Sequence, residues 1–216
     1  MDVLTLILGI TGFILAIIIH EVAHGYIADR LGDPTARLMG RLTLNPIPHI
    51  DILGSVVLPL ILVLLRSPFV FGWAKPVPID PYNLKNPKKD TALISLAGPT
   101  ANLIFAVTLS IFLRILLAIF PDGTFFGLFY YLISFNVMLA IFNLIPIHPL
   151  DGGKILVGIL PTRKAHQVDA FLTRFGTIIL FLLIFPIFGN TSIISPIISP
   201  VINLFLRFLI PGFSTI

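Results

Sequence analysis

Long apolar runs separated by short polar segments make up most of this chain. Five of these runs are about as long as a bilayer-spanning helix, which takes about 20 residues. They cover residues 3–28, 91–120, 124–145, 171–188 and 193–213. The first run turns polar near its end, and the third leads directly into a Pro-rich segment that contains an aspartate. The pattern therefore predicts membrane-spanning helices, two of which end in polar residues.

A sixth apolar run, at residues 52–65, has only 14 residues and contains Gly54 and Pro59. Because it is short for a span, we interpret it as a re-entrant or short hairpin segment, with a sixth span as the alternative. A segment that does not cross leaves every basic cluster on one side of the membrane, as expected for cytoplasmic loops. The predicted fold class is an all-α polytopic membrane protein with five to six transmembrane helices and one re-entrant or hairpin segment.

The composition agrees with this class and narrows the chemistry. Hydrophobic residues make up 56% of the 216 residues and charged residues 11%, and the mean hydropathy is +1.03. Soluble domains carry about 25% charged residues, so a soluble or disordered chain is excluded. The net charge of +4 comes from scattered basic residues, which argues against nucleic-acid binding. There is no cysteine, so a metal site would have to use His and carboxylate ligands.

The polar end of the first run has the spacing H-E-x-x-H, with His20, Glu21 and His24. Four residues are close to one helical turn, so the two imidazoles project from one face and can hold one Zn²⁺ ion. Glu21 would lie beside this ion and could take a proton from its water. The alternative is a buried helix whose polar groups are satisfied by neighbours, but ionisable groups inside a bilayer are costly and usually functional.

A catalytic zinc site needs a third protein ligand and an open position for water. Asp151 is the strongest candidate, because prolines stop the preceding helix and Gly152 and Gly153 permit a tight turn that aims its side chain. It could instead cap a helix that starts near Gly152. Three other residues are weaker candidates for this position: His148, His49 and Asp51.

Two motifs in apolar spans resemble the site-2 protease family of intramembrane zinc metalloproteases, in its compact bacterial type without PDZ or CBS domains. They are H-E-x-x-H at 20–24 and N-x-x-P-x-x-P-L-D-G-G at 143–153, and a G-P-x-x-N element at 98–102 also matches. The resemblance covers about residues 10–165 and includes similar segments at 45–51 and 71–78. It implies one intramembrane protease domain over residues 1–216, with a catalytic core at about 3–165 and C-terminal helices at about 168–213.

The resemblance also implies roles for individual residues. It gives Glu21 the role of catalytic acid/base. One Zn²⁺ ion per chain is expected to be held by His20, His24 and Asp151. Three residues are candidates for contacts with the substrate or the transition state: Asn143, Asn102 and His49. Asn143 is the strongest of these, because the family position is associated with holding a substrate or transition-state oxygen.

The predicted function is hydrolysis of peptide bonds in or near the transmembrane helix of a membrane-anchored protein, in regulated proteolysis. The enzyme is expected to be a multi-pass protein of the cell membrane with its site towards the cytoplasm, and its oligomeric state is open. Residues 77–79 are expected to form a hairpin at the membrane surface and to bind the unwound substrate by edge pairing. The alternatives are a metal transporter or channel, which would spread polar residues along a path, and a structural membrane protein or inactive relative, which would lack a ligand or the base.

Overall fold

Helices make up the regular structure of the chain in a computed structural model, which describes residues 3–65, 72–121, 123, 125–185 and 192–213. The helices are α1 (Val3–Leu31), α2 (Thr35–Leu38), α3 (Leu58–Leu64), α4 (Pro87–Ile119), α5 (Phe126–Asn143), α6 (Asp151–Ile159), α7 (Thr162–Ile184) and α8 (Ser195–Leu209). Two 3-10 turns, η1 (Ile47–His49) and η3 (Pro81–Asn83), and a π-helix, η2 (Ile52–Val57), complete the regular elements. The described residues contain no strand, which confirms the all-α class.

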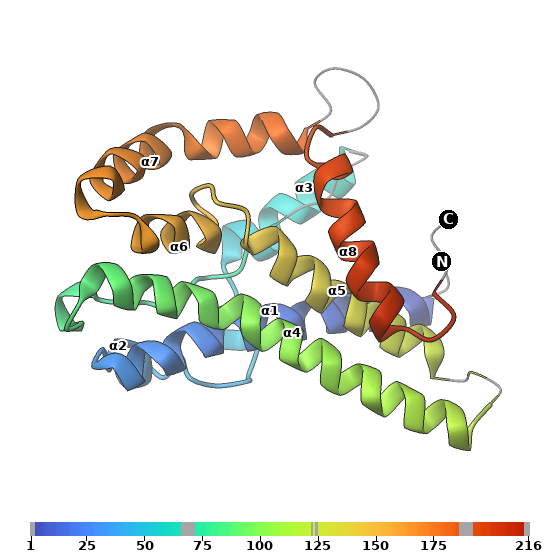
Figure 1. The fold of residues 1–216 in the computed structure, drawn as a ribbon. Coiled ribbons are helices and arrows are strands. Elements are labelled where there is room, and N and C mark those ends of the chain that lie inside the picture. The colour runs from blue at the N-terminus through green and yellow to red at the C-terminus, as the bar shows by residue number, and fades with distance from the viewer. Residues whose placement is uncertain (1–2, 66–71, 122, 124, 186–191, 214–216) are drawn as a thin grey trace.

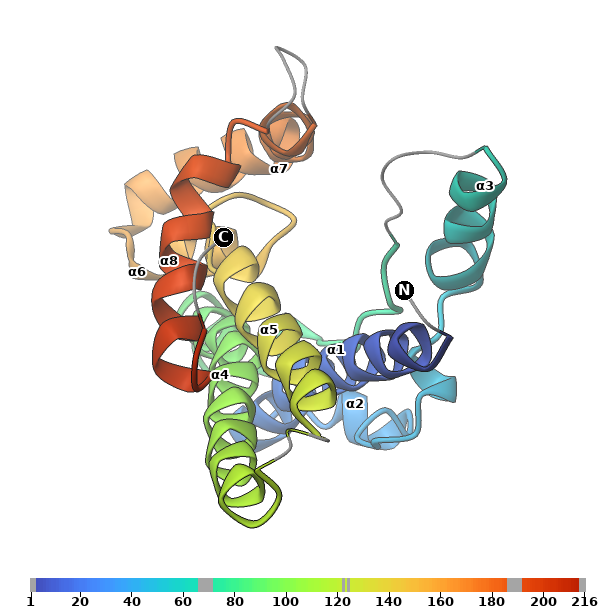
Figure 2. The same cartoon turned by 90° about the vertical axis from the view of Figure 1, so that its right-hand side faces the viewer.

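Within the part of the chain that the structure describes, four helices are long and apolar enough to cross a bilayer. They are α1, with its span at Gly9–Leu31, α4, α5 and α7. The predicted multi-pass architecture is therefore confirmed, and α8 and the η2–α3 segment are shorter apolar helices. The η2–α3 segment corresponds to the run of 14 apolar residues and is too short to span, as expected for a re-entrant or hairpin segment. Figure 2 shows it on one side of the molecule, with α7 and α8 on the other.

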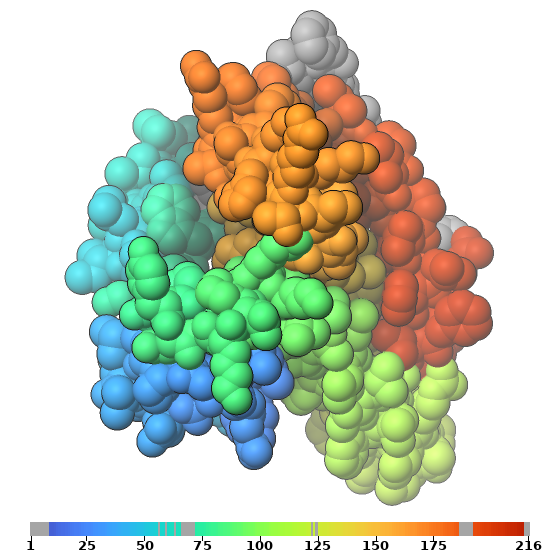
Figure 3. Space-filling model, turned by 60° about the vertical axis from the view of Figure 1, so that its left-hand side comes forward, coloured from blue at the N-terminus to red at the C-terminus, as the bar shows by residue number. Residues whose placement is uncertain are grey.

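Two helices begin earlier than the hydropathy pattern predicts. α4 starts at Pro87, four residues before the apolar run at 91–120, and α7 starts at Thr162, nine residues before the run at 171–188. A proline at or just before the first turn favours both starts, and polar opening turns carry no apolar signal. In Figure 3 the start of α4, in green, lies between the blue α1–α2 region and the orange α6–α7 region.

α4 is the central helix of the fold and packs against α1, α5 and α6 (Figure 1). Its second half forms an apolar core with α5 and α8. The buried residues of this core are Ala106, Leu109, Leu113, Ile133, Val137, Leu206 and Ile210. Its first half packs instead against the polar end of α1 and against α6. The long helix therefore joins an apolar packing region to the region that carries the sequence motifs.

The hairpin expected near the middle of the chain is not formed among the described residues. Residues 72–80, which we call the strap, contain neither helix nor strand. The backbone N–H of Val77 donates to Oε2 of Glu21 at 2.7 Å, and Nη2 of the buried Arg41 donates to the carbonyl of Lys75 at 2.8 Å. Other backbone groups of the strap bond to His49, Gly54 and Ser55. The described strap is therefore held by scattered single contacts and is not paired with a second strand.

Candidate metal centre

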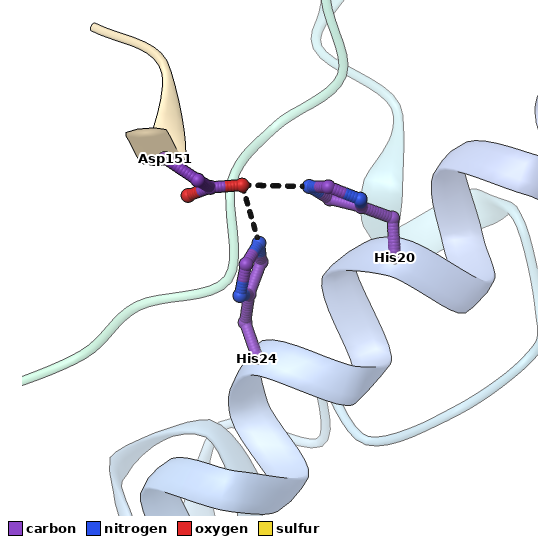
Figure 4. A group of neighbouring side chains, drawn as sticks. All are labelled: His20, His24 and Asp151. Atoms are coloured by element: carbon purple, nitrogen blue, oxygen red, sulfur yellow. Dashed lines mark hydrogen bonds and ion pairs between the residues drawn. The ribbon is translucent and has the colours of Figure 1, made fainter. Parts of the chain in front are cut away.

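Three side chains from distant parts of the chain meet in one buried cluster (Figure 4). His20 and His24 project from successive turns of α1, and Asp151 is the first residue of α6. Nε2 of His20 lies 3.0 Å from Oδ2 of Asp151, and Nε2 of His24 lies 3.2 Å from the same oxygen. None of the three residues is more than 7% exposed. The structure therefore brings together the three residues that the sequence motifs single out.

The position of Asp151 depends on the turn between α5 and α6. A Cβ atom on Gly152 would collide with the carbonyl oxygens of Leu144 and Ile145, so this close approach requires glycine. The N-cap residue of α6 is Leu150, and Asp151 follows it in the first turn. The alternative reading of Asp151 as a helix cap is thus wrong, and its carboxylate faces the two imidazoles.

α4 closes the other side of the cluster. A Cβ atom on Gly98 would lie 2.5 Å from Nε2 of His24 and 2.7 Å from Cε1 of His20. Real Cβ atoms do not come this close to other atoms, so only glycine allows both rings to pack on the backbone of α4. This contact gives a physical reason for the glycine of the G-P-x-x-N element.

The hydrogen bonds of the two imidazoles fix which nitrogen carries hydrogen. Nδ1 of His24 lies 2.7 Å from the carbonyl of Ile94, which can only accept, so this nitrogen donates. Nδ1 of His20 lies 2.9 Å from Oδ1 of Asn102. Nδ2 of Asn102 donates to the carbonyl of Ala16 at 3.0 Å, which assigns the oxygen of the amide to the side of His20. Both rings therefore carry hydrogen on Nδ1, and their Nε2 lone pairs point at the carboxylate.

Two imidazole lone pairs and a carboxylate oxygen that converge in a buried place repel one another unless a cation lies between them. Ligands held tetrahedrally at about 2.1 Å from Zn²⁺ are about 3.4 Å apart, and the distances in the cluster are close to this value. Two imidazoles and one carboxylate are ligands that Zn²⁺ takes in proteins, so the donor set fits Zn²⁺.

A cavity of about 160 Å³ adjoins the cluster. Its lining comes from α1, the strap, α4 and the α5–α6 region: His20, Glu21, His24, Pro76, Val77, Ile79, Ile94, Ser95, Asn143, Pro149, Asp151 and Lys154. Glu21 thus faces the same space as the cluster. Nδ2 of Asn143 donates to the carbonyl of Leu139 at 2.9 Å, which leaves its second amide hydrogen for another acceptor. The cavity therefore places an acid and an amide beside the cluster.

The weaker candidates for the third ligand lie elsewhere. His49 is buried in η1, where its Nε2 lies 3.0 Å from the carbonyl of Thr43. It does not line the cavity, and a contact with the substrate stays a prediction. Asp51 accepts a hydrogen bond at the start of η2. His148 lies 3.0 Å from Asp169 on α7, as expected for a satisfied residue near the surface.

Two residues of this region escaped the motif-based reading of the sequence. Lys154 lines the cavity from α6. Asn136 is fully buried in α5, and its Oδ1 accepts a hydrogen bond from Nδ2 of Asn102 at 2.8 Å. The signal for Asn136 was a polar side chain inside an apolar span, which usually has a function.

Comparison with known proteins gives an independent view of the site. The family model for peptidase family M50 matches residues 118–185, which include Asn143 and Asp151. A protein of Bacillus subtilis, named "Putative zinc metalloprotease YwhC", is 38% identical over 182 residues, which cover 78% of this chain and 74% of that protein. The chain belongs to peptidase family M50. This M50 chain is therefore a metallopeptidase of the site-2 protease family, as the motifs predicted.

Other relatives of this M50 chain are longer than the part they share with it. Rip2 of Mycolicibacterium smegmatis, named in the same way, is 33% identical over 150 residues, which cover 68% of this chain and 54% of Rip2. "Zinc metalloprotease MJ0392" of Methanocaldococcus jannaschii is 26% identical over 153 residues, which cover 70% of this chain and 34% of that protein. No solved structure matches the chain significantly.

Proposed function

We propose that this chain is an intramembrane metalloprotease in which His20, His24 and Asp151 hold one Zn²⁺ ion. The observation that carries the proposal is the convergence of Nε2 of His20 and Nε2 of His24 on one buried carboxylate oxygen of Asp151, at 3.0 and 3.2 Å. The names of the M50 relatives support zinc as the metal. When bound, zinc supplies Lewis acidity, which makes water a better nucleophile and a peptide carbonyl a better electrophile.

Glu21 is the proton carrier in this proposal. It is the only glutamate of the chain. It follows His20 directly on α1 and lines the same cavity as His20 and His24. The strap orients its carboxylate through the Val77 N–H bond to Oε2, so Oε1 remains to accept a proton from water. The same carboxyl group then gives the proton to the leaving amine nitrogen. General acid–base catalysis of this kind contributes a factor of about 10²–10⁴ in rate.

Asn143 is proposed to stabilise the oxyanion with its second amide hydrogen, because it faces the cavity from the end of α5. Water reaches the cavity past Lys154, whose side chain lies at the exposed rim. The basic residues of the loops support an orientation with this side of the protein towards the cytoplasm. The substrate class that fits a cavity enclosed by spanning helices is a membrane-anchored protein with a transmembrane helix, cleaved in or near that helix in regulated proteolysis.

The strap is proposed to bind the unwound part of the substrate beside Glu21. Its middle residues, Pro76 and Val77, form one wall of the cavity. Pairing with a substrate strand would require some of the strap's backbone groups to leave their present partners, such as Arg41. We therefore expect Arg41→Gln to change KM for a helical substrate more than kcat. A variant with the strap deleted that keeps full cleavage would rule this role out.

The test of the proposed function compares the wild type with Glu21→Gln in purified protein. We expect one zinc ion per chain in both proteins, and cleavage of a single-span substrate by the wild type only. Asp29→Asn is the matched control, because Asp29 forms a partly exposed ion pair with Arg37 and does not line the cavity. Equal cleavage by wild type and Glu21→Gln would overturn the role of Glu21. Zinc transport into vesicles without cleavage would favour a transporter.

A further inference from the structure

Two asparagines lie fully buried in the middle of spanning helices, Asn102 in α4 and Asn136 in α5. Together they form a continuous chain of hydrogen bonds that ends at the ring of His20. Nδ2 of Asn136 donates to the carbonyl of Leu132 at 2.8 Å, and Oδ1 of Asn136 accepts from Nδ2 of Asn102 at 2.8 Å. Polar groups at this depth have no water to replace a lost partner, so each bond of the chain matters.

The direction of this chain is fixed by main-chain carbonyls at two points. The carbonyl of Leu132 can only accept, so the amide nitrogen of Asn136 faces it and the oxygen faces Asn102. Asn102 then presents both hydrogens of Nδ2, one to Asn136 and one to the carbonyl of Ala16. Its oxygen is left for His20. A reversed amide at either asparagine would place two acceptors against each other and two donors against each other.

We infer that Asn136 is a positioning residue for the metal centre, which acts through Asn102 to keep His20 in the tautomer with hydrogen on Nδ1. Only this tautomer leaves the Nε2 lone pair of His20 for a metal ion. The inference rests on the proposed role of His20 as a ligand. Asn136 touches neither the cavity nor the cluster, so its effect is transmitted by one side chain.

The loss of Asn136 leaves one amide hydrogen of Asn102 without its partner in an apolar place. Asn102 keeps its bond to Ala16 but is no longer held from two sides, so its oxygen holds the Nδ1 hydrogen of His20 less firmly. The tautomer with hydrogen on Nε2 then becomes populated. Residues that orient metal-ligating histidines typically change metal affinity by about 10–100-fold when mutated. We expect Asn102→Leu to lower zinc affinity by a factor within this range, and Asn136→Leu to lower it by about tenfold.

The experiment measures the tautomer and the affinity separately, in detergent-solubilised full-length chain. ¹⁵N NMR of labelled histidines at pH 8 without metal reports which nitrogen of His20 carries hydrogen, with the signal assigned by His20→Gln. In the wild type Nδ1 of His20 should carry hydrogen throughout, whereas in Asn136→Leu a fraction of the molecules should carry it on Nε2 alone. Asn136→Ser serves as a second variant, because its shorter side chain severs the same link and stays polar. Both variants should lower zinc affinity, measured by competition with a chelator.

A double variant distinguishes positioning from a general loss of structure. If Asn136 acts through Asn102, then Asn102→Leu with Asn136→Leu binds zinc no more weakly than Asn102→Leu alone. Ser110→Ala is the matched control, since Ser110 is buried on α4 and donates to the carbonyl of Leu209, far along the helix from the cluster. It should lower thermal stability while zinc affinity and the His20 tautomer stay unchanged.

Three results would overturn the inference: wild-type tautomer and affinity in both Asn136 variants, additive losses in the double variant, or equal losses of zinc affinity in Ser110→Ala. Failure of the proposed function gives a different result. In that case His20→Gln would bind zinc as tightly as the wild type, whereas the tautomer measurement, made without metal, would still report on the asparagine chain.

Discussion

The two halves of α4 are buried in different ways. The first half packs Gly98 and Asn102 against the polar end of α1, where hydrogen bonds of fixed direction and a close approach to both rings hold the contact. The second half packs Leu109 and Leu113 against α5 and α8 mainly through apolar contacts, beside hydrogen bonds from Ser110 and Arg114 to carbonyls near the end of α8. The first half therefore depends on donor, acceptor and shape together, and the second half mainly on shape. Substitutions in the two halves should affect different measured quantities.

The largest effect is expected at the polar end, from Asp151→Ala. This change removes the carboxylate that both imidazoles face. Zinc affinity should therefore fall by more than the 10–100-fold typical of residues that only orient a metal ligand, and cleavage should be lost. Zinc content after dialysis and cleavage of a single-span substrate measure the two effects. Asp29→Asn, which changes an acid outside the cavity, should retain both. Full retention of zinc by Asp151→Ala would show that the third ligand is another residue.

At the apolar end, Leu113→Ala should act on stability alone. Leu113 is fully buried between α4, α5 and α8, and truncation of a buried leucine costs about 2–5 kcal/mol through the cavity it leaves. Thermal or denaturant unfolding in detergent measures the loss, and zinc affinity at low temperature should remain that of the wild type. Ile115→Ala, two residues further along the helix and half-exposed, is the control and should cost much less. Weaker zinc binding in Leu113→Ala would break the division of α4 into two halves.

Gly98→Ala tests the close approach at the site with a single methyl group. The added Cβ would lie 2.5 Å from Nε2 of His24, so the rings must shift away from α4 and zinc affinity should fall by about 10–100-fold. Gly127→Ala on α5 is the matched control, because nothing lies within 4 Å of its Cβ position. Alanine there should be neutral, or should stabilise the helix by about 0.5–1 kcal/mol. Unchanged zinc affinity in Gly98→Ala would mean that the rings do not need this contact.

The same contrast explains how much could be predicted from the sequence. Polar residues inside apolar runs stand out, so the sequence identified His20, His24 and Asp151 before their contacts were known. The direction of the hydrogen bonds through Asn136 could not be predicted, because it depends on which main-chain carbonyls lie beside the amides in the packed bundle. Hydropathy places spans well and helix ends poorly, since polar turns such as the start of α7 carry no apolar signal.

The strap shows the other limit. Its alternating prolines and apolar residues are typical of extended structure, and the sequence predicted a hairpin from them. Whether an extended segment pairs with another strand depends on what its backbone groups meet in the folded chain. Here they meet Glu21 and Arg41, which are more than thirty residues away in sequence. No local pattern contains that information.

The last prediction concerns a polar network outside the spans. It tests whether a polar network must lie inside the bilayer to influence the metal centre. Asp33 follows α1 and accepts hydrogen bonds from Thr35, Asp80 and Asn83. Burial raises the pKa of Asp33, but these hydrogen bonds outweigh it and lower this pKa below its usual value. Asp33→Asn replaces one carboxylate oxygen, which accepts hydrogen bonds, with an NH₂ group that faces other N–H donors. This change should lower the stability by about 1.5–3 kcal/mol at pH 7. Zinc affinity should change little, because Asp33 does not line the cavity.

The pH dependence makes this last prediction specific. A carboxylate with a lowered pKa in the folded state stabilises the protein at every pH above the unfolded pKa of about 3.9. That contribution is lost as pH falls through the folded pKa, because the protonated group no longer accepts all of its bonds. The stability difference between wild type and Asp33→Asn should therefore be constant above about pH 5 and shrink below about pH 4. A stability difference between the two proteins that grows as the pH falls would mean that the lowered pKa does not belong to Asp33. A tenfold loss of zinc affinity in Asp33→Asn would show that the hydrogen bonds of the loop after α1 are coupled to the metal centre. The division of α4 into two halves would then not separate the metal centre from the rest of the fold.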